Sequence, residues 1–192
     1  RDIQQARAEF ERRSAIRHAL TREVLGRYED AVFGLSTLFM VEQDVSRTQF
    51  LRTTRRMAGR IPAAFALQWV PFVPAARRAE VEAALQRSYD KPDLVFTELN
   101  AAGQRVPAGP RDVYLPISYI DPLEGSEVAV GYDLMSGPTL DYLLAARTTD
   151  RLTLTHQVRL VQVPTGQFAV IMIAPVRRAV RPNDPPESWI FE

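Results

Sequence analysis

The sequence predicts an α+β fold in which one long N-terminal helix precedes a domain with a five- or six-stranded antiparallel sheet. Residues 2–41 contain no proline and carry apolar side chains at close to helical spacing. In two later stretches, 113–119 and 128–134, apolar residues alternate with a period of two, which is typical of strands that bury one face. Helical patterns separate the strand-like segments, so we expect helices packed on one side of the sheet.

The first 44 residues are expected to form a stalk helix. A helix of about 40 residues would be roughly 60 Å long, which is more than one packed domain needs. Charged residues crowd its first half, whereas residues 31–40 are apolar nearly all round and should be buried against the domain. The heptad pattern is imperfect, so the sequence leaves open whether the first half is simply solvated or pairs with a second copy of the chain.

The domain that follows is expected to span residues 45–192. Ser46 and Gln49 have the spacing of a capping box, which predicts a helix to about residue 58. Further helices are expected over residues 75–89 and from 137 to about 148. The strand-like segments are 65–73, 94–99, 113–119, 128–134, 152–155, 157–163 and 168–176.

Composition excludes several kinds of function. A net charge of +1 argues against a nucleic-acid partner, and the absence of cysteine excludes disulfides and thiolate metal sites. No apolar run reaches the about 18 residues of a membrane-spanning helix, so neither a span nor a signal peptide is expected within this sequence.

Catalytic and cofactor chemistry is not predicted either. The two histidines, His18 and His156, lie in different elements and form no metal-binding set. The glycines near the expected turns stand alone, so there is no phosphate-binding loop and no cofactor is expected. No serine lies in a nucleophile elbow, and Asp133 and Asp141 form no evident acid–base pair. A small hydrolase would need a polar cleft that joins His156 to an aspartate.

Six short motifs, taken in order, resemble one known family. They are Phe65-Ala-Leu-Gln-Trp-Val-Pro, Tyr114-Leu-Pro-Ile-Ser-Tyr-Ile-Asp-Pro, Gly131-Tyr-Asp-Leu-Met-Ser, Ala146-Arg-Thr-Thr, Leu160-Val-Gln and Ala174-Pro-Val. Together they resemble the CHASE domain, the extracytoplasmic sensor of receptor histidine kinases, diguanylate cyclases and adenylate cyclases. The resemblance covers roughly residues 30–180. It implies that residues 45–192 form the membrane-distal PAS-like sensory domain, with the membrane-proximal part missing or truncated.

The resemblance also implies a small-molecule site in that domain, in a periplasmic location, with the membrane reached through segments outside this sequence. In plant members a carboxylate early in the helix after the Ser-Gly turn holds an adenine derivative. Here the best-matching position is Thr139, with Asp141 two residues on. An apolar slot with a few hydroxyls would suit a small, largely uncharged ligand. Ligand contacts are expected from Trp69, Tyr114, Tyr119, Tyr132, Leu134, Thr139, Asp141, Thr155, Val161 and Ile173.

The leading hypothesis is therefore a non-enzymatic sensor that binds a small molecule and dimerises through its long helix. The alternative is a dimerisation or protein-interaction module whose interior is filled by its own side chains, and a packed interior without a cavity would decide for it. Asp133 is expected to cap the turn at Ser136, and Gly131 to permit a close backbone approach. The arginine pairs at 55–56, 77–78 and 177–178 are expected to be solvated.

Overall fold

The computed structural model describes residues 2–42, 44–61, 64, 66–159 and 168–177. Four α-helices are present: α1 (Asp2–Val41), α2 (Arg47–Met57), α3 (Arg78–Tyr89) and α4 (Leu140–Thr149). The strands are β1 (Leu67–Trp69), β2 (Val73–Pro74), β3 (Thr97–Leu99), β4 (Arg105–Pro107), β5 (Val113–Tyr114), β6 (Tyr119–Asp121), β7 (Thr153–Leu154) and β8 (Met172–Ile173). Short 3₁₀ turns are η1 (Ala58–Arg60), η2 (Ala75–Arg77), η3 (Glu127–Ala129) and η4 (Leu134–Ser136).

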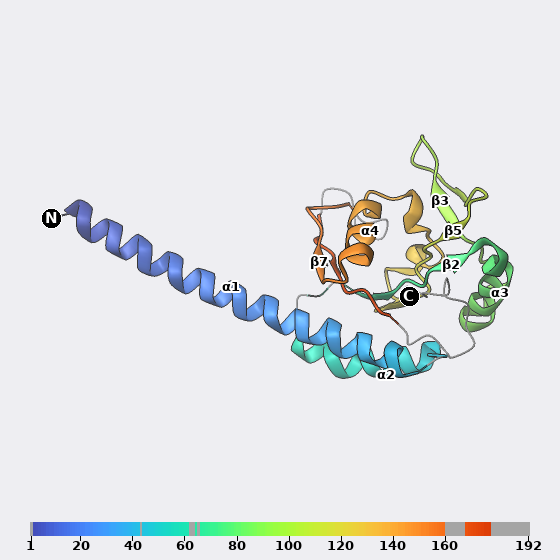
Figure 1. Ribbon diagram of the computed structural model, residues 1–192, viewed down its shortest axis with the longest axis horizontal. Coiled ribbons are helices and arrows are strands. Elements are labelled where there is room, and N and C mark those ends of the chain that lie inside the picture. Colours follow the sequence, from blue (N-terminus) through green and yellow to red (C-terminus); the bar gives the residue numbers. More distant parts are fainter. Residues whose placement is uncertain (1, 43, 62–63, 65, 160–167, 178–192) are drawn as a thin grey trace.

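The long N-terminal helix is confirmed. Helix α1 runs for 40 residues and projects away from the rest of the molecule as one rod (Figure 1). Residues 3–25 are exposed along their whole length, and burial begins only near Ala31. Exposed ion pairs one turn apart, such as Arg7 with Glu11, add a few tenths of a kcal/mol each to such a helix. The apolar last third of α1 therefore holds it on the domain, while the polar part stands in solvent.

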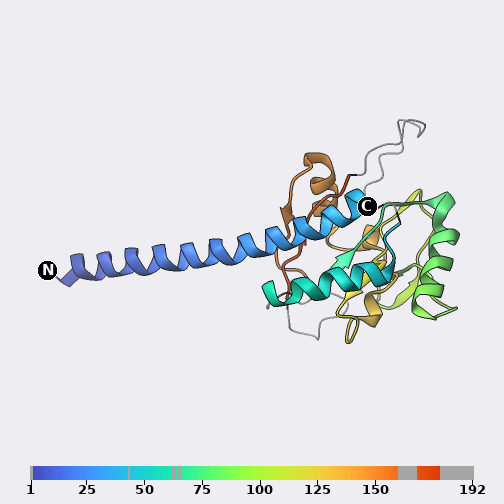
Figure 2. The same cartoon turned by 90° about the horizontal axis from the view of Figure 1, so that it is seen from below.

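Helix α2 runs antiparallel to the end of α1 and beside it (Figures 1 and 2). Its predicted capping box is confirmed, since Ser46 Oγ accepts a hydrogen bond from the Gln49 N–H and Gln49 Oε1 accepts one from the Ser46 N–H. The fully buried Phe50 packs on Phe39, with 6.3 Å between ring centroids. The two helices thus form one wall of the core.

The predicted five- or six-stranded sheet is wrong for the described residues. Their strands form two-stranded antiparallel pairs, β1 with β6, β2 with β5, β3 with β4 and β7 with β8. Each strand is only two or three residues long. Prolines account for much of this, because Pro74 and Pro107 end two strands and Pro116 separates β5 from β6. A proline has no backbone N–H to donate, so it interrupts a ladder.

The strand expected over residues 128–134 is also wrong. Residues 127–129 form η3, and the chain then turns at Gly131, whose φ is +75°. Isolated backbone β-bridges nevertheless place this segment between two of the strand pairs. The Thr97 N–H donates to the Gly131 carbonyl at 2.9 Å, and the Ile117 N–H donates to the Tyr132 carbonyl at 3.0 Å. Backbone bonds to residues 131–133 therefore join the strand pairs that a continuous sheet would have joined.

Gly131 permits the close backbone approach that the sequence predicted. A Cβ at this position would lie 2.9 Å from the carbonyl oxygen of Val95. We expect Gly131→Ala to lower the free energy of unfolding by more than the about 1–2 kcal/mol that a left-handed backbone costs an L-residue. Gly103→Ala is the matched control, because φ is +73° there and nothing lies within 4 Å. Denaturant unfolding measures both losses, and equal losses would contradict the steric argument.

Among the described residues, three groups of buried side chains form the core. One joins α1 and α2 and contains Leu35, Phe39, Val45, Phe50 and Val176. A second lies under α3 and contains Val73, Leu85, Phe96, Ala108 and Tyr114. The third contains Ile117, Ile120, Ala129, Val130 and Tyr132. The two buried tyrosines, Tyr114 and Tyr132, thus pack inside the domain.

Candidate functional site

A cavity of about 720 Å³ lies between the docked end of α1 and the rest of the domain. Small-molecule sites commonly enclose about 300–1,000 Å³ and are mostly apolar, so the size and the lining are suitable. The walls come from α1, β1, α4, β7 and the segment around β8. The apolar residues that line it include Leu25, Val32, Leu35, Phe39, Trp69, Phe72, Leu134, Met135, Leu143, Leu144, Leu154 and Ile173.

Helix α1 forms one of these walls directly. Phe39 is 1% exposed, and its ring stacks on Trp69 of β1 with 3.4 Å between centroids and 11° between planes. Trp69 and Phe39 both line the cavity, as does Leu35 one turn earlier on α1. A molecule in the cavity would therefore touch the stalk helix and the domain at once.

Helix α4 supplies the polar groups of the opposite wall. Thr139, immediately before α4, is 4% exposed, and its hydroxyl has no hydrogen-bond partner among the residues that the structure describes. A buried hydroxyl without a partner costs about 1–3 kcal/mol, which a ligand that bonds to it would recover. Arg147, two turns further along α4, also lines the cavity, and its guanidinium carbon lies 4.7 Å from the centroid of the Phe72 ring.

Four of the ten residues predicted to bind a ligand line this cavity: Trp69, Leu134, Thr139 and Ile173. Five others, Tyr114, Tyr119, Tyr132, Asp141 and Thr155, lie outside its lining. Val161 falls outside the described residues. Ligand contact by these six residues stays a prediction.

Two of the predicted hydroxyls that lie outside the cavity lining form hydrogen bonds with backbone groups. Tyr119 Oη donates to the Val45 carbonyl at 3.2 Å, which ties β6 to the turn after α1. Thr155 Oγ1 accepts from the Ile171 N–H at 2.9 Å and so links the β7 and β8 strands. Asp141 is exposed on the outer side of α4.

Sequence reasoning missed the α1 wall and Arg147. A signal for the first was present, because residues 31–40 are apolar on more than one face and α2 covers only part of them. Arg147 belongs to the Ala146-Arg-Thr-Thr motif, but nothing in its local pattern distinguishes an arginine that faces a cavity from a solvated one.

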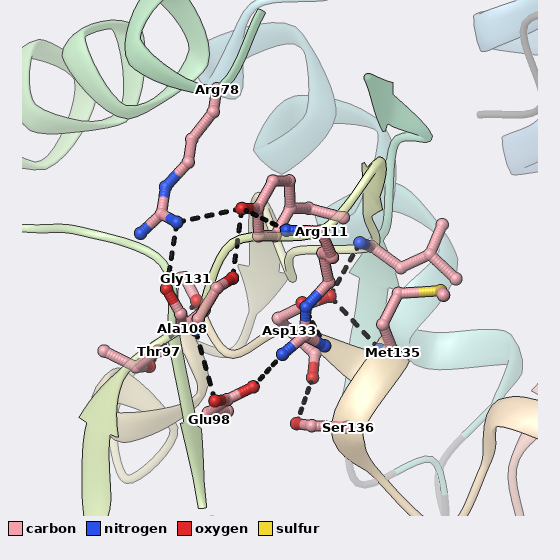
Figure 3. A network of polar contacts seen from close by, with 12 residues as sticks. Arg78, Thr97, Glu98, Ala108, Arg111, Gly131, Asp133, Met135 and Ser136 are labelled. Atoms are coloured by element: carbon pink, nitrogen blue, oxygen red, sulfur yellow. Dashed lines mark hydrogen bonds and ion pairs between the residues drawn. The ribbon is translucent and has the colours of Figure 1, made fainter. Parts of the chain in front are cut away.

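A buried polar network fixes the wall next to the cavity (Figure 3). Asp133 is completely buried, and its Oδ1 accepts from the backbone N–H groups of Leu115 at 2.7 Å and Met135 at 3.1 Å. Its Oδ2 lies 3.1 Å from Nη1 of Arg111, an ion-pair contact whose angles are not those of a hydrogen bond. Because Leu115 and Met135 both line the cavity, Asp133 positions that wall.

The expected capping role of Asp133 is confirmed, since its carboxylate caps η4 and its own carbonyl accepts from Ser136 Oγ at 2.8 Å. Burial raises the pKa of Asp133 above its ordinary value. The two backbone N–H groups and Arg111 act in the opposite direction, but burial has the larger effect. Arg111 also pairs with Glu98. The carboxyl is therefore structural.

The prediction that the 77–78 arginine pair is solvated is wrong for Arg78. Its Nη1 donates to the Ala108 carbonyl at 2.9 Å and to Tyr114 Oη at 3.0 Å, while its Nε pairs with Glu82 at 2.9 Å. This arginine joins α3 to the loop that carries Arg111 (Figure 3).

The described part of the chain holds neither a metal-binding cluster nor a membrane-spanning helix. Within it, His, Asp and Glu side chains form no group of three or more that could hold a metal ion. None of its helices combines the length and apolarity needed to cross a membrane.

Comparison with known proteins identifies the family. The CHASE domain matches residues 43–189, which is most of the chain, so the resemblance found in the six motifs is confirmed. No curated protein matches the sequence. CHASE domains are extracellular sensor domains of signalling receptors, and they are sensory rather than catalytic. The chain belongs to the CHASE domain family.

Proposed function

We propose that this chain is the ligand-binding sensor domain of a bacterial transmembrane receptor, a histidine kinase or a diguanylate cyclase. In this proposal residues 1–44 form the stalk and residues 45–192 the membrane-distal PAS-like domain, held outside the inner membrane by segments beyond this sequence. The domain itself binds and does not catalyse. Membership of a sensory family supports the general role, and the cavity supports the mode of action.

The observation that carries the proposal is that α1 lines the cavity. A ligand placed there contacts Leu35 and Phe39 of the stalk as well as Trp69 of the domain. A ligand shifts an equilibrium between two arrangements only by the difference in its affinity for them. Because the ligand would touch both bodies, any change in how α1 sits on the domain changes the ligand's contacts, which provides such a difference.

We place the ligand against Trp69, Leu134, Thr139 and Ile173, where the buried Thr139 hydroxyl has no partner within the described part of the chain. Loss of one neutral hydrogen bond is worth about 0.5–1.5 kcal/mol, so Thr139→Val should weaken binding by about 2- to 13-fold. Thr148→Val is the matched control, because its exposed hydroxyl donates to the Leu144 carbonyl on the same helix.

A metabolite library tested by thermal unfolding examines the function directly. Compounds that occupy the cavity should raise the melting temperature, and the gain should be smaller in Thr139→Val than in Thr148→Val. If no compound stabilises the chain and native mass spectrometry finds none bound, the ligand-binding function is wrong.

The alternative, a dimerisation module without a small-molecule ligand, is favoured by the exposed apolar residues of α1. Ile3 is 86% and Phe10 72% exposed, and with Val24 they stand at multiples of seven residues. That spacing is typical of a seam between paired helices, although Arg17 interrupts it. We propose that a second copy of the chain pairs along this seam, with or without a ligand.

Sedimentation equilibrium of the chain measures this pairing. Association that depends on concentration is expected. If the chain dimerises while the library gives no response, the alternative function is correct, and a monomer at every concentration would argue against pairing through α1.

A further inference from the structure

We infer that the ligand of this cavity is an elongated, mainly apolar molecule with one anionic group, which Arg147 holds. The inference rests on the proposed function, since it specifies the ligand of the same site. The apolar pattern and hydroxyls of the sequence predicted a largely uncharged ligand. The placement of Arg147 in the cavity wall changes that expectation.

The described residues that line the cavity carry charge of one sign only. Among the described residues that line it, Arg147 carries the only charged side chain, and there is neither an aspartate nor a glutamate. A charge that leaves water needs a partner of the opposite sign. A ligand carboxylate, sulfonate or phosphate would find one in this wall, whereas an ammonium group would not. The site therefore discriminates against amines and against zwitterions such as free amino acids.

The charged end of Arg147, and not only its stem, reaches the wall. Its guanidinium carbon lies 4.7 Å from the centroid of the Phe72 ring, and Phe72 itself lines the cavity. A guanidinium has five N–H donors in a planar fork, so it can bind a carboxylate while keeping other contacts.

The distance between the two polar groups of the α4 wall gives the ligand its shape. Thr139 and Arg147 are eight residues apart, which is about 12 Å along the axis at 1.5 Å per residue. Leu143 and Ala146 lie between them on the same wall. The matching ligand has an anion at one end, an apolar middle and a hydrogen-bonding group at the other end. Small acids such as acetate are too short to reach both groups.

Three probes with one skeleton test the inference on the whole chain: 4-(4-hydroxyphenyl)butanoate and the corresponding alcohol and amine. A hydrogen bond to a charged group is worth about 1.5–3 kcal/mol, so calorimetry should show the carboxylate binding at least about 10-fold more tightly than the alcohol. The amine should bind most weakly. Arg147→Met should remove this preference and leave the affinity for the alcohol within about 3-fold, because only the charged contact is lost.

Arg151→Met is the matched control, since Arg151 is exposed just beyond α4 and does not line the cavity. Nile red, a neutral apolar dye, reports separately whether the cavity binds at all. If Arg147→Met does not fold, the order of the three probes on the unchanged chain decides the question, and Arg147→Lys should keep that order.

Equal binding of the three probes, a preference for the amine, or an unchanged preference in a folded Arg147→Met variant would overturn the anionic ligand. Binding of the dye without any probe would overturn it too. In each of these cases the anionic preference fails, but binding of the dye or of a probe still supports the proposed ligand-binding function. If neither dye nor probe binds, the proposed function fails together with the inference.

Discussion

Asp133→Ala should lower the free energy of unfolding by about 2–5 kcal/mol, because it removes a buried carboxylate that accepts from two backbone N–H groups and takes one of two acidic partners from Arg111. The carboxylate is completely buried and contacts Arg111 at 3.1 Å. Alanine also leaves the N–H groups of Leu115 and Met135 without an acceptor, at a cost of about 1–3 kcal/mol for each that stays buried. Water that enters the space left by the carboxylate would reduce the total, so we expect a loss near the lower end of the range.

Denaturant unfolding at neutral pH measures this loss. Asp112→Ala is the matched control, because it makes the same change on an exposed side chain next to Arg111, and it should cost less than about 0.5 kcal/mol. Similar losses in the two variants would show that the Asp133 network contributes nothing particular to stability.

Asp133→Asn tests the charge state of the same group. Since the pKa of Asp133 is raised in the folded chain, the folded form binds the proton more tightly than the unfolded form. The contribution of this group to stability is then greatest below its ordinary pKa of 3.8 and declines as the pH rises through the folded pKa. The stability of the unchanged chain relative to Asp133→Asn should therefore fall as the pH rises above 3.8. A relative stability that rises with pH would contradict a raised pKa.

Phe39→Ala is expected to destabilise the chain by about 3–5 kcal/mol, the usual cost of truncating a buried phenylalanine. Phe39 is 1% exposed and stacks on Trp69 at 3.4 Å, so the variant loses the main contact between α1 and β1. The adjoining cavity makes collapse around the truncated side chain less effective, which keeps the cost high.

Phe33→Ala provides the comparison on the same helix, because Phe33 is 51% exposed. Its expected cost is below about 1 kcal/mol, and denaturant unfolding of both variants measures the difference. Equal effects would mean that α1 is not held on the domain through Phe39. Hydrogen exchange of α1 adds a local measurement, since amides near Phe39 should lose protection first in Phe39→Ala.

Local signals predicted the helices well. The capping box of Ser46 and Gln49 is complete within four residues, and α1 needs only an unbroken run of good helix formers. The sheet failed because strand pairing depends on residues far apart in sequence. Alternation over residues 128–134 resembled a strand, yet the positive φ of Gly131 turns the chain there.

The candidate site also contains residues that local sequence patterns predicted and residues that only tertiary packing reveals. Trp69, Leu134, Thr139 and Ile173 were found because strand patterns and family motifs mark their positions. Arg147 was not, since its partner Phe72 lies 75 residues away and the face of α4 that meets the cavity depends on tertiary packing. Arg78 was judged solvated for the same reason: its acceptors Ala108 and Tyr114 belong to a distant loop and strand.

Because the first part of α1 extends beyond the domain, a small rotation at its docked end becomes a larger displacement at its N-terminal end. Residues 3–24 are exposed and lie outside the cavity lining, and they span about 33 Å at 1.5 Å per residue. If α1 tilted by about 5° where it docks on the domain, its N-terminal end would move by about 3 Å. This displacement is more than half of the 5.4 Å helical pitch. A change in the Phe39–Trp69 contact that tilts α1 by this amount would therefore displace the far end of the helix as well.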